Sequence, residues 1–371
     1  MTNKNFIVWS GTLSLLLSLL SGCSSGPQTE TIIISSKEEI NYVDQTTSPF
    51  QVKKIYRLPL EYTSSGNLLG WSSFDSVVAS FKTGSIPERF QLKRLTYPFE
   101  QSHQIVSEIT MDEGQMILSP NGKHLGVRSE SITGESLKVL SLEDGKETEI
   151  AKFSNQIYVQ DISWSTNSRY LAYLAIDRSD REKSSLGLYD MESRTSKIYE
   201  LKDFAREDTP ISVHVSDDGR GVLFTMFPEH NDRSGTRSIL LGEMKDNKVE
   251  KQFTREFGGK QNAWISNDQF VFLGYDGTLY EYDRRNGALS VILERVSTFR
   301  LSHDTKRIAY SLYDENIIYV GKLQGRNVLS SEPVYHGIVP TNMSWSLDNK
   351  KLLIQGQSDS TEGQSFILEF E

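Results

Sequence analysis

Cysteine is almost absent from this sequence, in which Cys23 is the single cysteine among 371 residues. One thiol excludes an internal disulfide and a zinc site built from several cysteines. The sequence also lacks a phosphate-binding loop, a G-x-G-x-x-G motif, an H-E-x-x-H motif and an EF-hand loop. No residue is therefore assigned to catalysis, to a cofactor or to a metal ion, and no cofactor is expected.

Basic residues are fewer than acidic ones. The chain has 40 Lys and Arg against 49 Asp and Glu, a net charge of −9. An acidic chain of this kind is not expected to bind nucleic acid or to be held to anionic lipid by a basic patch. If the chain is attached to a membrane, an anchor other than a basic patch must attach it.

The N-terminal hydrophobic run is too short to cross a membrane. Residues 6–20 are uncharged and rich in Leu, and as a helix they would span about 22 Å, against a hydrocarbon core of roughly 30 Å. The run follows Lys4 and leads into Leu20-Ser21-Gly22-Cys23. A secretory signal peptide consists of a basic N-terminal region, an apolar central region and small residues before the cleavage site.

Leu20-Ser21-Gly22-Cys23 resembles the lipobox of bacterial lipoproteins. The resemblance implies that Cys23 carries a lipid, that residues 1–22 are removed, and that the chain is anchored on the extracytoplasmic side of a bacterial cell membrane or envelope. An ordinary signal peptide with a chance cysteine is the alternative. Residues 23–51 are rich in Ser, Thr, Gln and Glu, and we expect a flexible tether there.

A short pattern recurs beyond residue 60. An apolar, alternating stretch reaches a serine, a polar turn with Asn or Asp follows, and a second apolar stretch begins. The seven repeat serines lie 36 to 51 residues apart, near the period of about 40–45 residues of a four-stranded propeller blade. They are Ser72, Ser119, Ser165, Ser216, Ser266, Ser302 and Ser346. Apart from Trp9, every tryptophan lies one or two positions before one of these serines.

The turns and the chain ends agree with a closed ring of such units. Asn121-Gly122 and Asp218-Gly219 suit tight hairpins that need positive φ angles. The seventh unit ends after its third strand, and pairing residues 52–60 as its outermost strand would close the ring and cover an edge. We therefore predict an all-β fold, a seven-bladed β-propeller of four-stranded blades over residues 52–371, closed by an N-terminal strand. A different all-β architecture and a six-bladed ring are the alternatives.

The repeat, a serine followed by Asp or Asn, a turn and an apolar strand, resembles that of TolB-type β-propellers over residues 52–371. The chain departs from that family because a proline precedes the Asp or Asn only at Pro120, and because the fifth unit is shortened at Ser266-Asn267-Asp268. The resemblance implies a protein-interaction module of the cell envelope.

Two groups of side chains are candidates for a site. His214 lies two residues before Ser216 and is expected to point into the central channel as a packed side chain, whereas His124 and His303, at hairpins, are expected to be solvated. Long charged loops in the third and fourth units are usually solvated insertions, yet insertions on one face of a repeat array often mark its binding surface. The residues predicted to contact a partner are Arg178, Arg181, His230, Arg233 and Arg237.

Three functions remain open at this point. The first is a lipid-anchored, non-catalytic scaffold that binds another envelope protein or a cell-wall component. The second is a propeller enzyme, a lyase, lactonase or glycosidase, with its site in the channel, and the third is a sensor of a small ligand or glycan. A scaffold predicts a broad rim with exposed apolar or Arg-rich patches, and an enzyme predicts a deep channel with converging carboxylates or histidines.

Overall fold

A computed structural model of the chain describes residues 30–33, 49–85, 88–111, 113–180, 183–201, 208–228, 236–258, 261–357 and 363–371. These residues form strands, with one α-helix, α2 (Glu61–Ser64), among them. In this part of the chain no helix combines the length and apolarity needed to span a bilayer. The predicted signal peptide and Cys23 lie outside the described residues.

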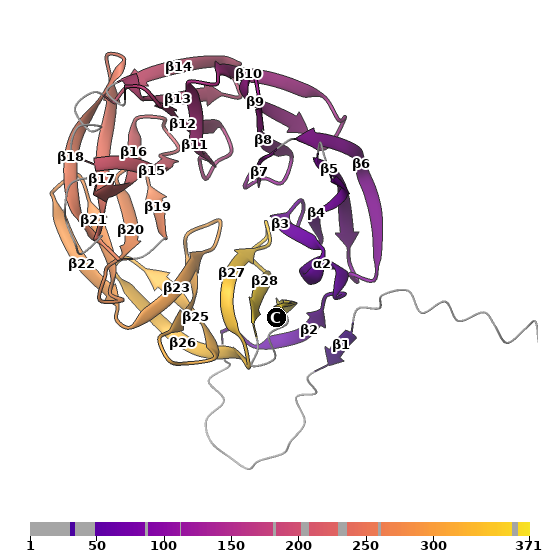
Figure 1. Ribbon diagram of the computed structural model, residues 1–371. Coiled ribbons are helices and arrows are strands. Elements are labelled where there is room, and N and C mark those ends of the chain that lie inside the picture. The colour runs from indigo at the N-terminus through magenta and orange to yellow at the C-terminus, as the bar shows by residue number, and fades with distance from the viewer. Residues whose placement is uncertain are drawn as a thin grey trace, which may run out of the picture.

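The strands form antiparallel sheets set around a common axis, each with its first strand innermost (Figure 1). We call the strands of one four-stranded run a to d, from the inside to the outside. The first runs are β3 (Gly66–Trp71), β4 (Ser76–Ser85), β5 (Glu88–Thr96) and β6 (Gln101–Met111), then β7 (Glu113–Leu118), β8 (His124–Ser131), β9 (Gly134–Ser141) and β10 (Glu147–Ser154).

An eight-stranded sheet follows. It contains β11 (Ile157–Trp164), β12 (Tyr170–Asp177), β13 (Ser185–Asp190), β14 (Thr195–Glu200), β15 (Asp208–Val215), β16 (Gly221–Pro228), β17 (Arg237–Lys245) and β18 (Lys248–Phe257). Its two halves are joined through their outer strands, β14 and β18, by the one parallel pair Glu200 and Lys248.

The remaining runs complete the ring. They are β19 (Asn262–Ser266), β20 (Gln269–Leu273), β21 (Leu279–Asp283) and β22 (Ala288–Leu293), then β23 (Val296–Leu301), β24 (Arg307–Leu312), β25 (Ile317–Gln324) and β26 (Asn327–His336), then β27 (Val339–Trp345), β28 (Lys351–Gln357) and β29 (Gly363–Phe370). The prediction of an all-β propeller is confirmed.

The two ends of the domain meet in one sheet. β2 (Val52–Arg57) pairs antiparallel with β29, with Ile55 opposite Leu368, so the predicted closing strand is confirmed. Beyond it, β1 (Glu30–Ile33) pairs antiparallel with β2, with Ile32 opposite Ile55. Four residues of the segment expected to be a flexible tether therefore form the outermost strand of a five-stranded sheet.

The repeat serine builds the turn between strands a and b. Ser165 Oγ donates to Asn167 Oδ1 (2.7 Å) and accepts the Tyr170 N–H (2.9 Å), while Asn167 Oδ1 accepts the Arg169 N–H (3.0 Å). Ser168 adopts a φ of 63°. The same three bonds form at the turns of Ser119, Ser216, Ser302 and Ser346. The predicted hairpins between strands a and b are confirmed in all seven runs, and five of them have this set of three bonds.

The tryptophan next to a repeat serine ties its blade to the preceding one. The indole N–H groups of Trp164, Trp264 and Trp345 each donate to a carbonyl of the preceding inner strand, at 3.2 Å. Trp71 makes the equivalent bond to Ser344 O (2.9 Å) and thereby joins the first sheet to the last. These bonds fix the register of neighbouring inner strands, and so they fix which side chains face the axis.

Candidate functional site

The up-and-down path of the strands gives the ring two different faces. Turns between strands a and b and between c and d lie on one face, which we call the turn face. Connections from b to c and from d to the next a lie on the opposite face, the loop face. Both faces carry features of a binding surface.

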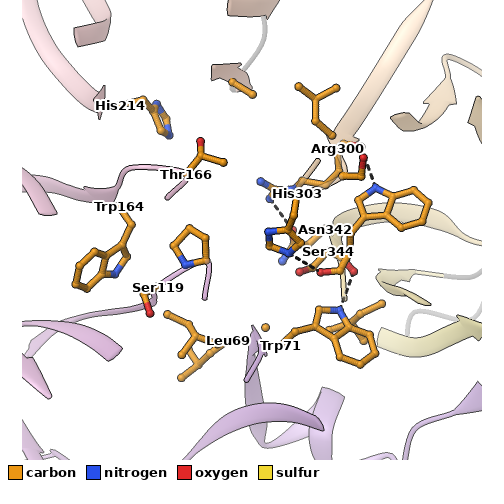
Figure 2. Close-up of a pocket in the computed structure, with 18 of the residues that line it drawn as sticks. Leu69, Trp71, Ser119, Trp164, Thr166, His214, Arg300, His303, Asn342 and Ser344 are labelled. Carbon is orange, nitrogen blue, oxygen red and sulfur yellow. Dashed lines mark hydrogen bonds between the residues drawn. The ribbon is translucent and has the colours of Figure 1, made fainter. Parts of the chain in front are cut away.

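A cavity of about 310 Å³ opens on the axis at the turn face. Inner strands and a-to-b turns from around the ring line it, and Figure 2 shows ten of these residues labelled. The polar lining residues include Ser119, Thr166, His214, Asn262, Arg300, Ser302, His303, Thr305, Asn342, Ser344 and Gln355, and the apolar ones include Leu69, Leu118, Pro120, Leu301 and the four repeat tryptophans. The lining residues lie on or next to inner strands of all six sheets, so the closed ring assembles this site.

The cavity has an electropositive lining. Arg300 is the one lining residue charged at neutral pH, and no Asp or Glu is among those that line the cavity in the described part of the chain. Burial, together with the nearby charge of Arg300, lowers the pKa of His214 to about 4. Burial also lowers the pKa of His303 below its usual value. Both imidazoles are therefore neutral near pH 7, and Arg300 dominates the local field.

A backbone carbonyl and a side-chain amide of the neighbouring blade hold Arg300 in place. Its Nε donates to Met343 O (2.8 Å) and its Nη2 contacts Asn342 Oδ1 (3.4 Å), while the side chain stays exposed to the cavity. Sequence reasoning did not select Arg300. It lies two residues before Ser302, the same repeat position that made His214 a channel candidate, and this position could have identified it.

The histidine predictions had mixed outcomes. The prediction that His214 points into the channel is confirmed, because it lines the cavity. The prediction that His124 and His303 are solvated is wrong, because both are half-buried. His303 lies 3.0 Å from Trp345 O through Nε2, and His124 lies against the Trp164 ring with centroids 6.4 Å apart. Neighbouring blades cover these turn residues, which a single hairpin cannot reveal.

The loop face carries exposed apolar side chains. Of the eleven large hydrophobic residues that are exposed in the described part of the chain, six lie on this face: Leu60, Ile132, Phe227, Tyr275, Tyr313 and Val339. Ile132 is 95% exposed and Tyr275 is 74% exposed. The Tyr313 ring packs against Gly277 in the loop that carries Tyr275, where an added Cβ would lie 2.6 Å from the ring. Tyr275 and Tyr313 therefore belong to adjacent loops.

Two of the five predicted partner residues, Arg178 and Arg237, are described, and both lie at strand ends on this face. Arg178 follows β12 and is half-exposed; it lies 3.5 Å from Glu130 of the preceding blade and 4.8 Å from the centre of the Tyr158 ring. Arg237 opens β17 and is half-buried. Arg181, His230 and Arg233 lie outside the described residues. Arg178 is thus already engaged within the chain by one ion pair and one ring contact.

Two perturbed carboxyl groups lie between neighbouring blades, Asp161 on inner strand β11 and Glu135 on β9, the third strand of its blade. Burial raises the pKa of Asp161 to about 6, and its Oδ2 accepts the Val213 N–H of the next blade at 2.9 Å. Burial also raises the pKa of Glu135, whose Oε2 accepts the Val159 N–H at 2.9 Å. Neither lines the cavity, and each bridges two blades. In the described ranges no three His, Cys, Asp or Glu side chains are grouped so as to hold a metal ion.

No protein-family model and no curated protein matches this chain. Solved structures do match it. An oligogalacturonate lyase in complex with manganese is 12% identical, with a TM-score of 0.60 over 93% of this chain and 99% of that one. An oligogalacturonate lyase from Vibrio parahaemolyticus is 13% identical, with a TM-score of 0.59 over 92% and 98%. The β-propeller domain of the Trilobed protease from Pyrococcus furiosus is 13% identical, with a TM-score of 0.55 over 83% and 95%. At these identities the likeness establishes a β-propeller fold and nothing finer.

Proposed function

We propose that this chain is a lipid-anchored β-propeller of a bacterial cell envelope that acts as a non-catalytic scaffold for an envelope protein. Cys23 would hold it on the extracytoplasmic side of the membrane, and the loop face would bind the partner. The observation that carries the proposal is the pair of exposed aromatic side chains, Tyr275 and Tyr313, in adjacent loops of that face. Single exposed hydrophobic residues are ordinary, whereas a grouped set is typical of an interaction surface.

The composition of the loop face fits a protein partner. Aromatic and Arg side chains are enriched at protein interfaces, and Tyr275, Tyr313 and Arg178 supply both kinds. Arg181, His230, Arg233 and Arg237 belong to loops of the same face in our proposal and would pair with acidic groups at the rim.

We also propose that the ring has seven blades of the TolB type. The eight-stranded sheet contains two successive up-and-down runs, β11 to β14 and β15 to β18, which meet at one residue pair. Counting these runs separately gives seven four-stranded units, in agreement with the seven repeat serines.

A channel enzyme is the second candidate. The likeness to oligogalacturonate lyases and the two histidines that line the cavity favour it. Among the described residues the lining has no carboxylate, which a lyase, lactonase or glycosidase of the usual acid–base kind would use. Turnover of a glycan or a lactone by the purified protein would favour the enzyme over the scaffold.

Crosslinking in native cells tests the scaffold. A partner protein crosslinked to the wild-type chain should be lost from the double variant Tyr275→Ser, Tyr313→Ser, because these side chains are exposed in adjacent loops of the proposed surface. The matched control is Ile198→Ser, which removes an exposed apolar side chain from outer strand β14. Equal crosslinking by the double variant and the control would refute the docking surface.

The anchor has its own test. Cys23→Ala should leave the precursor unprocessed by a lipoprotein signal peptidase and should abolish metabolic labelling with a fatty acid. A Cys23→Ala variant that is still labelled and stays in the membrane fraction would overturn the lipoprotein assignment without bearing on the loop face.

A further inference from the structure

The cavity on the turn face has no role in a docking surface on the loop face. It is concave, it is lined by side chains from several blades, and its volume of about 310 Å³ lies at the lower end of the range for small-molecule sites. A protein segment would not fit within it, whereas a molecule of the size of a modified amino acid would.

The charge of the lining selects the sign of the ligand. Arg300 is exposed to the cavity, and two of its N–H groups are used in its contacts with Met343 and Asn342. A guanidinium has five N–H donors, so three remain for a ligand. With no carboxylate in the described lining to neutralise it, this group favours an anion, and its fork of donors matches a carboxylate.

The lining also has polar atoms that lack a partner. His214 Nδ1 and both side-chain polar atoms of Asn262 are buried and make no hydrogen bond within the described residues. Buried polar atoms in proteins normally have a partner, and a ligand or its bound water is a common one. His214 and Arg300 lie on opposite sides of the cavity (Figure 2). Leu69 and Leu301 add apolar wall.

We propose that this cavity binds a small molecule that carries a carboxylate at one end and a neutral hydrogen-bonding group at the other, joined by an apolar body. The carboxylate pairs with Arg300. The neutral group lies against the part of the wall that His214 and Asn262 form, and the apolar body packs on Leu69 and Leu301. The acidic protein thus contains a site for an acid in a cavity whose described lining residues include no acid.

The test uses pairs of probes that differ in one group. N-acetyl amino acids and hydroxybenzoates are titrated into the purified full chain by calorimetry, each beside its own primary amide, which has the same shape and no charge. We expect at least one carboxylate to bind with a Kd below about 1 mM and its amide to bind about tenfold or more weakly, since a charge-assisted pair is replaced by a neutral contact. The absence of such a carboxylate, or equal binding of both members of every pair, overturns the proposal.

Variants then test whether Arg300 is responsible. Arg300→Gln should remove the preference for the carboxylate, and Arg300→Lys, which keeps the charge and loses the fork, should keep part of it. The matched control is Arg307→Gln, because Arg307 is in the same blade, also donates to a carbonyl of the next blade, that of Asn349, and does not line the cavity. Loss of the preference in Arg307→Gln to the same extent would contradict the assignment.

A measurement on the wild-type chain does not depend on how the variants fold. Burial is the main cause of the lowered pKa of His214, and the charge of Arg300 lowers it further; a carboxylate bound to Arg300 offsets this second contribution. Titration of the histidine NMR signals should therefore give a higher apparent pKa for His214 with the bound carboxylate than with its amide. No difference between the two would place the ligand elsewhere.

Discussion

Asp161 should make the stability of the protein fall as the pH rises through its titration range. Burial raises the pKa of this carboxyl group from 3.8 to about 6 in the folded chain. Between these two values the folded state binds more protons than the unfolded state, so the free energy of unfolding decreases with pH. The stabilising term is fully present below pH 3.8 and is lost as the pH rises through the folded pKa of about 6.

The magnitude follows from the size of the shift. About two pKa units correspond to about 3 kcal/mol in total, of which roughly half is lost between pH 5 and pH 8. Asp161→Asn keeps a side-chain oxygen to accept the Val213 N–H and removes the titration. Relative to the wild type, the variant should gain about 1–2 kcal/mol between pH 5 and pH 8.

Urea unfolding at both pH values measures this difference. The control is Asp246→Asn in the exposed turn between β17 and β18, where φ is 48° and Asn is well tolerated. The control should show the same pH dependence as the wild type. If Asp161→Asn also follows the wild type at both pH values, burial of this carboxyl group between two blades does not affect its ionisation, and the reasoning fails.

Three further changes test how the blades are joined, each by urea unfolding at constant pH. Gly122 and Gly145 share a φ of 71°, but a Cβ at Gly122 would lie 2.5 Å from Ser72 Cα, whereas nothing lies within 4 Å of a Cβ at Gly145. Gly145→Ala should lower the free energy of unfolding by about 1 kcal/mol, and Gly122→Ala should lower it clearly more. Equal costs would contradict the close approach of Gly122 to Ser72. Trp71→Phe removes the N–H that donates to Ser344 O between the first and last sheets, and it should cost about 1–3 kcal/mol of stability. An unchanged urea midpoint would show that this bond does not hold the ring closed. Ser346→Ala leaves the buried Lys351 N–H without its acceptor and should cost about 1–3 kcal/mol of stability. Ser266→Ala, in the exposed and shortened turn, should change stability by less than about 0.5 kcal/mol. The reverse order would refute the role given to the repeat serine.

The sequence predicted the propeller because its repeated turns are local. In the turn from Ser216 to Gly221 the acceptors, the donors and the positive φ of 69° at Gly219 all lie within six residues. Such chemistry is visible in one copy and becomes specific when it recurs. The pairing of β1 with β2 was not predicted, because it depends on an edge that exists only after β2 has paired with β29. A short apolar stretch gives no sign of such a partner.

The channel site depends on residues far apart in the sequence, and the repeat identifies only part of it. His214 and Arg300 share one position relative to their serines, so the repeat can name both as residues that face the axis. The repeat cannot give the protonation state of a histidine at that position. Counted from the sequence, Arg300, His214 and His303 could bring three positive charges to the cavity, but burial keeps both imidazoles neutral. What the cavity binds is therefore set by the packing of blades around these side chains, which exists only once the ring has closed.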